Sequence, residues 1–360
     1  MNGSIFGKMF SISTWGESHG NAIGVVVNGC PAGIKLSDKD VQIALDRRKP
    51  GASPYTTKRQ EDDLVEILSG IFEGYTTGTP IAMLIRNTNQ RSGDYDRESY
   101  RPGHADYTYD LKYGFRDYRG GGRASGRETA ARVAGGAVAQ KFLAELGVAV
   151  SAYTFSISDV AVSEIDFSIR NALNMPDMKA FEQASKLVEN AMQAGDSLGG
   201  EICCVITDIP PGVGEPVFDK LEAVLSHGVM SIGGIKGIEF GSGFSAAKMK
   251  GSEHNDSFFM KNGKIAKRTN NAGGMYGGIS DGSPVSFRVA VKPTPSISQT
   301  QQSVNNKGED IELNIRGRHD PLIVPRAVVV VEAMAALAVA DLVLQSVSSK
   351  IDNIKKILLQ

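Results

Sequence analysis

The segment AVVVVEAMAALAVADLVLQSV, residues 327–347, is the most apolar stretch of this 360-residue chain. It is long enough for a helix that crosses a bilayer. Two carboxylates, Glu332 and Asp341, interrupt it, however, and an ionised carboxylate near the bilayer centre costs about 3 kcal/mol or more. We therefore expect a helix that is buried inside a soluble protein, not a membrane span.

The overall composition limits the classes of partner. The formal net charge is −1, so the chain has no general attraction to nucleic acid or to an anionic membrane, and any anion site must be a local cluster. Its three cysteines, two of them adjacent, form no disulfide framework, and the N-terminal MNGSIFGKMF lacks the basic and apolar regions of a signal peptide. We expect a cytoplasmic protein that binds neither nucleic acid nor membrane.

Helix and strand patterns interleave along the chain, no run has the composition of a linker, and the length suits one large domain or two ordinary ones. The clearest helix covers 125–146, where Ser125-Gly126-Arg127-Glu128 fits a capping box. Residues 94–123 have no clean period and are expected to be a long, ordered, functional loop. Further helices are expected over 38–48, 178–192 and 218–226, and strands over 10–15, 23–27, 201–207, 235–240 and 285–291. Several connections are too short for parallel crossovers, which favours mixed or antiparallel sheets with covering helices.

The motif Gly16-Glu17-Ser18-His19-Gly20 fits the G-x-S-x-G pattern of a nucleophile elbow. That elbow requires a helix after the turn, whereas NAIGVVVNG, residues 21–29, predicts a strand. A serine hydrolase is therefore the weaker interpretation. His19, on a tight turn between two glycines, is a candidate proton donor to a leaving group. A turn histidine bonded to backbone fits the local sequence equally well.

The segment RPGHADYTYDLKYGFRDYRGGGRASGRETAAR, residues 101–132, places six arginines around His104 and Gly120-Gly121-Gly122. The glycines open the helix expected at Ser125, so free backbone N–H groups and the positive end of a helix lie beside guanidinium groups. These features predict a phosphate-binding loop, with a solvated charged loop as the alternative. Interleaved aspartates favour a pocket over a nucleic-acid surface.

Other segments carry candidate ligands for an anionic molecule. LDRRKPG, residues 45–51, contains Arg47 and Arg48, and VKPTPS, residues 291–296, ends a strand with further phosphate-binding side chains. NNAGGMYGGISDG, residues 270–282, suits close passage of backbone past a flat ring. In IRGRHDP, residues 315–321, Asp320 is a candidate base or orienting acceptor. The sequence has no H-E-x-x-H or paired C-x-x-C motif, so we expect no metal site. Together these residues indicate an enzyme that binds a phosphorylated small molecule, with a flat phosphorylated cofactor and histidines as acids.

These motifs, together with TTGTPI and GRHDP followed by EAMAALAVADLVL, resemble the chorismate synthase family in content and order, from about residue 5 to residue 345. The resemblance implies an α+β fold with one domain over residues 1–360: a single-domain β-α-β sandwich of antiparallel sheets flanked by helices, assembled as a homotetramer. It implies a lyase that uses reduced FMN (FMNH2) to convert 5-enolpyruvylshikimate 3-phosphate into chorismate by 1,4-anti elimination of phosphate. This is the last step of the shikimate pathway in aromatic amino acid biosynthesis. An ordinary flavin oxidoreductase is the alternative.

The resemblance also implies roles for individual residues. His19 matches the histidine that protonates the departing phosphate, His104 the one that protonates the reduced flavin, and Asp320 the aspartate that assists proton removal through the flavin. A contact with NADPH is implied for Arg48, and flavin contacts are implied for Arg123, Ala124, Ser125, Gly233, Gly234, Gly277, Lys292, Pro293, Thr294, Pro295, Ser296 and Arg318. Substrate contacts are implied for Arg47, Arg48 and Arg127.

The sequence departs from the family pattern at several of these positions. Pro54 replaces a frequent arginine, which weakens any direct contact with NADPH at Arg48, so NADPH is expected to act as an indirect reductant. Gly233-Gly234 replaces Asn-Ala, and Ala124 and Pro295 each replace a serine. No extra segment for a flavin reductase is visible, so an external reductase is expected.

Overall fold

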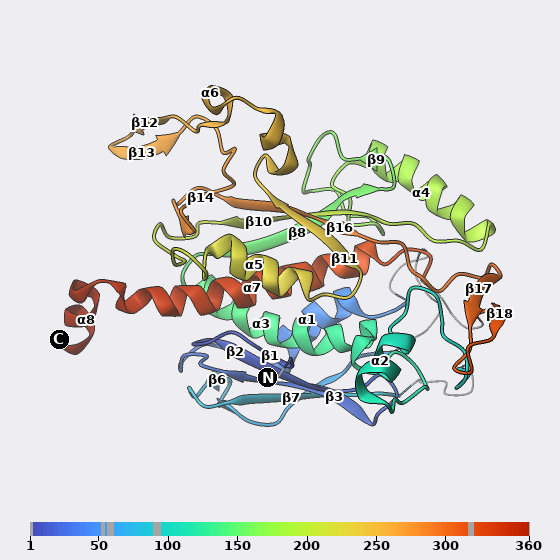
Figure 1. The fold of residues 1–360 in the computed structure, drawn as a ribbon. Coiled ribbons are helices and arrows are strands. Elements are labelled where there is room, and N and C mark those ends of the chain that lie inside the picture. The colour runs from blue at the N-terminus through green and yellow to red at the C-terminus, as the bar shows by residue number, and fades with distance from the viewer. Residues whose placement is uncertain (1–2, 52–54, 56–60, 89–94, 316–319, 360) are drawn as a thin grey trace.

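Two antiparallel five-stranded sheets enclose a layer of helices (Figure 1). The computed structural model describes residues 3–51, 55, 61–88, 95–315 and 320–359. The first sheet has the order β1 (Ile5–Phe6), β2 (Ser11–Gly16), β3 (Ala22–Asn28), β7 (Ile81–Arg86) and β4 (Val65–Ile67). The second has the order β11 (Ile235–Phe240), β16 (Val285–Val291), β10 (Gly200–Thr207), β8 (Ala149–Ile157) and β9 (Val160–Ala161). The helices between them are α1 (Asp38–Arg48), α3 (Thr129–Glu145), α5 (Leu221–Met230) and α7 (Val324–Ser346).

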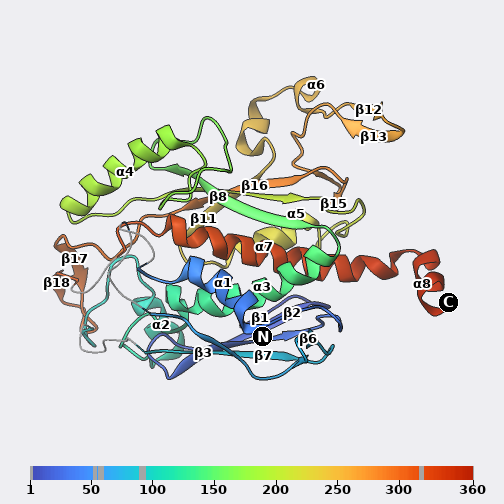
Figure 2. The same ribbon diagram turned by 180° about the vertical axis from the view of Figure 1, so that it is seen from behind.

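This arrangement confirms the expected α+β class and the β-α-β sandwich of antiparallel sheets. Seen from behind, the helical layer is again between the two sheets, and α8 projects from the body beyond the end of α7 (Figure 2). The remaining elements lie at the edges: β5 (Ile71–Phe72), β6 (Tyr75–Thr76), α2 (Asp106–Tyr113), α4 (Met178–Gln193), α6 (Gly251–His254), β12 (Phe258–Lys261), β13 (Lys264–Lys267), β14 (Met275–Tyr276), β15 (Ile279–Ser280), β17 (Gln301–Val304), β18 (Asp310–Leu313) and α8 (Ile351–Leu358).

The helix α7 is the apolar stretch that the sequence marks, and it is buried as expected. It has the length and hydropathy to cross a membrane, yet 89% of its most apolar window is buried within the protein. Its two carboxylates are only 3% (Glu332) and 2% (Asp341) exposed. Each is hydrogen-bonded, as a buried charge must be. The Asp341 carboxylate accepts from the backbone N–H groups of Lys8, Met9 and Phe10 at 2.6–3.0 Å.

Glu332 connects α7 to two other elements. Its carboxylate accepts two hydrogen bonds from the Arg47 guanidinium, at 2.6 and 3.0 Å, and one from the Ala152 backbone N–H in β8, at 2.9 Å. The interruptions that argue against a membrane span are therefore the groups that tie α7 to the end of α1 and to the second sheet.

Two sequence-based expectations for helices are wrong in detail. The helix expected from Ser125 begins at Thr129, after a 3₁₀ turn over Gly126–Glu128. The Ser125 hydroxyl does accept from the backbone N–H of Arg127, at 3.2 Å, but the Glu128 carboxylate bonds Thr14 and Arg132 in place of the reciprocal capping-box contact. Expected residues 218–226 are helical only from Leu221, and that helix continues to Met230.

The segment 94–123 is not one continuous loop, because its described part contains α2 and a 3₁₀ turn over Gly122–Ala124. The helix α2 leaves three of its four large apolar side chains exposed, with Tyr107 at 53%, Leu111 at 68% and Tyr113 at 60%, while Tyr109 is half-buried. The helix α2 therefore has no apolar stripe that faces the core, which is the pattern that predicts an amphipathic helix from sequence.

The helices α3 and α7 cross at very close range at Gly136. A Cβ atom built on Gly136 would lie 2.3 Å from Ala333 Cβ and 2.5 Å from Ala333 Cα. Because the second of these atoms belongs to the backbone of α7, the clash cannot be relieved by a change of rotamer.

We expect Gly136→Ala to destabilise the protein by about 1–3 kcal/mol, the usual effect of overpacking a core. Helix propensity alone predicts the opposite sign, a gain of about 1 kcal/mol. Urea unfolding measures the difference. Gly251→Ala, where nothing lies within 4 Å of the new Cβ, is the control. A Gly136→Ala protein as stable as the wild type would contradict this account of the crossing.

Candidate functional site

The His19 turn, residues 17–21, connects β2 to β3. The Gly20 backbone N–H donates to the Glu17 carbonyl at 3.1 Å, and the buried Ser18 hydroxyl lies 3.1 Å from His19 Nδ1. A strand follows the turn, so the nucleophile-elbow interpretation is wrong. The His19 ring meets the Tyr95 ring edge to face, with 5.1 Å between centroids.

The glycine loop packs directly against the His19 turn. A Cβ atom on Gly120 would lie 2.4 Å from His19 Nδ1 and 3.1 Å from Ser18 Oγ, and the φ of Gly120 is +136°. Only glycine fits there without moving the histidine. Arg123 fixes the loop from the other side, because its guanidinium donates to the Gly16 carbonyl at 3.1 Å and to Thr14 Oγ1 at 2.7 Å.

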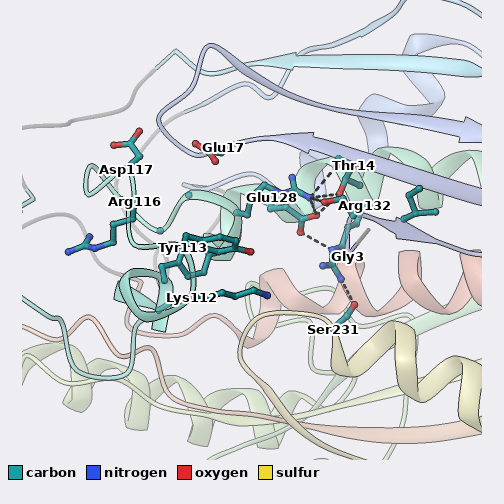
Figure 3. A pocket seen from close by; sticks show the side chains of 18 of the residues that line it. Gly3, Thr14, Glu17, Lys112, Tyr113, Arg116, Asp117, Glu128, Arg132 and Ser231 are labelled. Atoms are coloured by element: carbon teal, nitrogen blue, oxygen red, sulfur yellow. Dashed lines mark hydrogen bonds and ion pairs between the residues drawn. The ribbon is translucent and has the colours of Figure 1, made fainter. Parts of the chain in front are cut away.

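A cavity of about 780 Å³ opens between the glycine loop, α2, the N-terminal segment, the C-terminal end of α5 and the middle of α7. This volume is in the range that small-molecule and cofactor sites usually have. Figure 3 shows Arg116 and Asp117 at one end of the cavity and Arg132 with Ser231 at the other. Its charged and aromatic lining comprises Phe6, Glu17, Asp106, Tyr109, Lys112, Tyr113, Phe115, Arg116, Asp117, Arg123, Glu128, Arg132 and His227.

The two candidate histidines are not among the residues that line this cavity, but residues next to each of them are. Glu17 and Gly120 line it next to His19, and Ala105 lines it next to His104. The Arg101 guanidinium stands 5.1 Å from the centre of the Tyr95 ring, which in turn contacts His19. The backbone N–H of His104 donates to the Arg101 carbonyl at 3.2 Å, so the two histidine segments are joined through Tyr95 and Arg101.

His104 is held by two hydrogen bonds. Its Nδ1 lies 2.9 Å from the Pro102 carbonyl, which can only accept, so Nδ1 carries a proton. Its Nε2 lies 2.8 Å from the Ser296 hydroxyl. Burial, and then the positive charge of Arg101, lower the pKa of His104 below its ordinary value of 6.5. His104 is therefore neutral at pH 7.

The segments after β16 and after α5 lie next to His104. The Lys292 ammonium donates to the Gly103 carbonyl at 3.0 Å, and the Lys292 backbone N–H donates to the Gly234 carbonyl at 2.9 Å. The structure thus brings together His104, Gly233-Gly234 and the 292–296 segment. Thr294 Oγ1 is shielded from solvent and has no hydrogen-bond partner among the described residues.

Gly277 lies apart from this group. It is in the two-residue turn between β14 and β15, and the backbone N–H at the start of α5 donates to the carbonyl of the next residue, Gly278, at 2.8 Å. Gly233 follows the other end of α5, which is ten residues long. Gly277 and Gly233 are therefore separated by the length of that helix, about 15 Å.

The three arginines predicted to bind substrate each have a carboxylate partner. Asp63 accepts from Arg48 with one oxygen and from Arg127 with the other, and Glu61 lies 3.3 Å from Arg127. Arg47 pairs with Glu332, but its side chain remains 48% exposed. Burial lowers the pKa of Arg48 to about 10, which still leaves it charged at pH 7. Burial alone would raise the pKa of Asp63, but the two guanidinium groups hold it below its ordinary value.

Asp320 lies just before α7 and is oriented by an arginine. Its Oδ2 accepts from Arg326 Nη1 at 2.5 Å, and Arg326 Nε donates to the Arg48 carbonyl at 3.0 Å. The structure therefore places Asp320 beside the end of α1, near the Arg48 pair. Arg318 and Pro54 lie outside the described residues.

The cavity also includes side chains that the sequence analysis did not select. His227 lacks charged neighbours in the sequence, yet it lines the cavity and meets the Phe6 ring at 5.4 Å between centroids. Arg132 donates to Ser231 Oγ at 2.5 Å across the same wall. These residues come from α5 and α3, and only the tertiary fold brings them together. Within the described ranges, no group of three His, Cys, Asp or Glu side chains could hold a metal ion.

The fold and this site define a class of protein: a β-α-β sandwich in which a glycine–arginine loop lines a cavity and packs against a histidine-bearing turn. The sequence model of the family "Chorismate synthase" matches residues 10–344. Curated chorismate synthases from Lachnoclostridium phytofermentans and Lachnospira eligens are 58% and 56% identical, each over 99% of both chains. That of Methanocella arvoryzae is 53% identical over 95% of this chain and 94% of its own length.

A solved structure described as "Crystal Structure of Chorismate Synthase" superposes with a TM-score of 0.76. It is 31% identical, over 97% of this chain and 96% of that one. The chain belongs to the chorismate synthase family, whose members are lyases.

The lowered pKa of His104 predicts a pH dependence of stability. The unfolded chain takes up this proton near pH 6.5 and the folded chain only at lower pH, so protonation favours the unfolded state. The free energy of unfolding should therefore fall as the pH drops below 6.5, down to the folded-state pKa. Denaturant unfolding between pH 7.5 and pH 5 should show a shallower fall in His104→Gln than in the wild type. Equal slopes in the two proteins would contradict the assignment.

Proposed function

We propose that this protein converts 5-enolpyruvylshikimate 3-phosphate into chorismate by 1,4-anti elimination of phosphate, with reduced FMN as cofactor. This reaction would be the last step of the shikimate pathway for aromatic amino acid biosynthesis. Family membership supports the reaction. The main structural support for this reaction is the close packing of Gly120, in the predicted phosphate-binding loop, against the His19 ring. This packing places a predicted anion site beside a proposed general acid.

The described residues fit a phosphorylated flavin. Thr294 Oγ1 is buried without a partner, and Lys292 and Ser296 stand on either side of it in the sequence, so this segment would hold the cofactor's phosphate. Gly233-Gly234 and the backbone of Arg123, Ala124 and Ser125 would border its ring. When bound, reduced FMN supplies electron density to the carbon–oxygen bond that breaks.

His19 is the proposed acid for the departing phosphate. The Ser18 hydroxyl lies beside Nδ1 and orients the ring, so we assign Nε2 as the nitrogen that donates the proton. The adjacent glycine loop offers backbone N–H groups to the same anion. A positioned acid of this kind contributes about 10²–10⁴-fold to the rate.

His104 and Asp320 are the proposed proton-handling groups on the cofactor side. His104 holds its proton on Nδ1 against Pro102 and presents Nε2 toward Ser296 and the cofactor segment. Asp320, oriented by Arg326, would assist removal of the substrate's hydrogen.

The substrate carries two carboxylates and a phosphate, so it requires several cations. Arg47 is the best placed for direct contact, because its side chain is 48% exposed. Arg48 and Arg127, both bonded to Asp63, would hold the wall of the site in place and contribute positive potential.

We further propose a cytoplasmic homotetramer that depends on an external flavin reductase, with NADPH as the indirect reductant. Gly277 is then open to two interpretations: a contact with flavin bound to another protomer, or a structural role in the β14–β15 turn.

An anaerobic assay of phosphate release tests the reaction. We expect release from 5-enolpyruvylshikimate 3-phosphate only with reduced FMN, and without stoichiometric oxidation of the flavin. His19→Ala should lower kcat by about 10²–10⁴-fold while FMN binding is retained. His254→Ala is the matched control and should keep wild-type activity.

Three results would each count against the proposal. Release of phosphate without flavin would remove the cofactor's role. Oxidation of flavin in proportion to product would indicate an ordinary oxidoreductase. Wild-type turnover in His19→Ala would remove its role as the acid.

A further inference from the structure

The Asn87 side chain, which directly follows β7, lies between the His19 turn and Arg127. Its Nδ2 donates to the Glu17 carbonyl at 2.9 Å and to the Gly20 carbonyl at 2.8 Å. These two carbonyls stand on either side of Ser18 and His19. Its Oδ1 accepts from Arg127 Nε at 2.8 Å. One amide therefore bridges the turn that bears the proposed acid and the buried Arg127.

The chemistry of the partners fixes the orientation of this amide. Two backbone carbonyls can only accept and a guanidinium can only donate, so the amide nitrogen must face the turn and the oxygen must face Arg127. The rotated amide would lose all three hydrogen bonds. The Asn87 backbone N–H adds a fourth bond, to the Asn21 carbonyl at 3.1 Å.

Arg127 is a rigid anchor for this bridge. Its side chain is only 4% exposed, and besides Asn87 it bonds Asp63 and, at 3.1 Å, the Arg86 carbonyl. Every nitrogen of the guanidinium thus has a partner. The Asn87 amide therefore connects the His19 turn to the buried ion pair of Arg127 and Asp63.

The turn needs such an external restraint. Gly16 has a φ of +87° and Gly20 closes the turn, and glycines that permit a tight turn also leave it many other conformations. Within the turn, the hydrogen bond from the Gly20 N–H to the Glu17 carbonyl is a single restraint on these conformations. Two further bonds from a side chain outside the turn restrict its movement relative to the glycine loop.

We propose that Asn87 is a positioning residue for His19: its amide holds the Glu17 and Gly20 carbonyls so that the imidazole keeps its place against the glycine loop. This inference rests on the proposed acid role of His19. Asn87 touches neither substrate nor cofactor in this role, and acts through the turn alone.

Asn87→Asp tests the hydrogen bonds to the turn separately from the hydrogen bond to Arg127. The carboxylate has the same shape and still accepts from Arg127, but it donates nothing to the two carbonyls and repels them. We expect kcat to fall by about 10–10²-fold, the effect of a small displacement of a catalytic group, with KM and FMN affinity within about twofold of the wild type. Asn28→Ala, at the exposed far end of β3, is the control and should keep wild-type kcat.

A double-mutant cycle with His19→Ala gives the decisive readout, because a merely structural role would lower activity in both backgrounds. We expect Asn87→Asp to have little further effect once His19 is alanine. The inference is overturned if Asn87→Asp keeps wild-type kcat, or if it lowers the residual activity of His19→Ala by the same factor.

The controls keep this test separate from that of the proposed function. Wild-type turnover in His19→Ala would contradict the acid role, and this inference with it. A large loss in His19→Ala together with an unaffected Asn87→Asp would contradict this inference alone. If thermal unfolding shows that the Asn87→Asp protein is not folded, the same comparisons are made with Asn87→Ser.

Discussion

The buried carboxylates of α7 are the constraint on which the layered structure depends. A helix this apolar can lie between two sheets without penalty, but Glu332 and Asp341 can be buried only if other groups bond them. Asp341 takes backbone N–H groups from the segment just before β2, and Glu332 takes one from β8 and a guanidinium from α1. The same two residues therefore set the position of both sheets relative to the central helix.

The candidate site is built on that frame by a second set of bonded charges. The pairing of Arg48 and Arg127 on Asp63 joins the end of α1 to the loop that precedes α3. From Arg127 the connection passes through Asn87 to the His19 turn. Glycine segments allow the close approach of backbone to the His19 ring, and buried ion pairs supply the rigidity that the glycines lack.

Local motifs were enough to predict the four helices of the middle layer and five of the ten strands in the two main sheets. The alternation in β2 and β3, the apolar run of α7 and the glycines at 120–122 each carry a signal within a few residues of sequence. The start of α3 was misplaced because Glu128 bonds Thr14 and Arg132, partners that a capping-box pattern does not reveal. The helix α2 was missed because most of its large apolar side chains stay exposed.

The interactions that position the site could not be predicted in this way. Arg47 and Arg48 look like free anion ligands in sequence, since nothing nearby shows that Glu332 and Asp63 will pair with them. Asn87 and His227 carry no motif, and only the folded chain places them beside the His19 turn and the cavity. Side chains that meet across distant segments have no local pattern, whereas those that shape a turn do.

The most direct test of the central claim, that the His19 turn and the His104 segment serve one flavin-binding site, is a crystal structure with FMN and substrate bound. The account predicts the flavin phosphate at Thr294 and Lys292, with both imidazoles facing the same bound molecules. FMN bound elsewhere, with His19 and His104 facing separate cavities in every protomer, would contradict it.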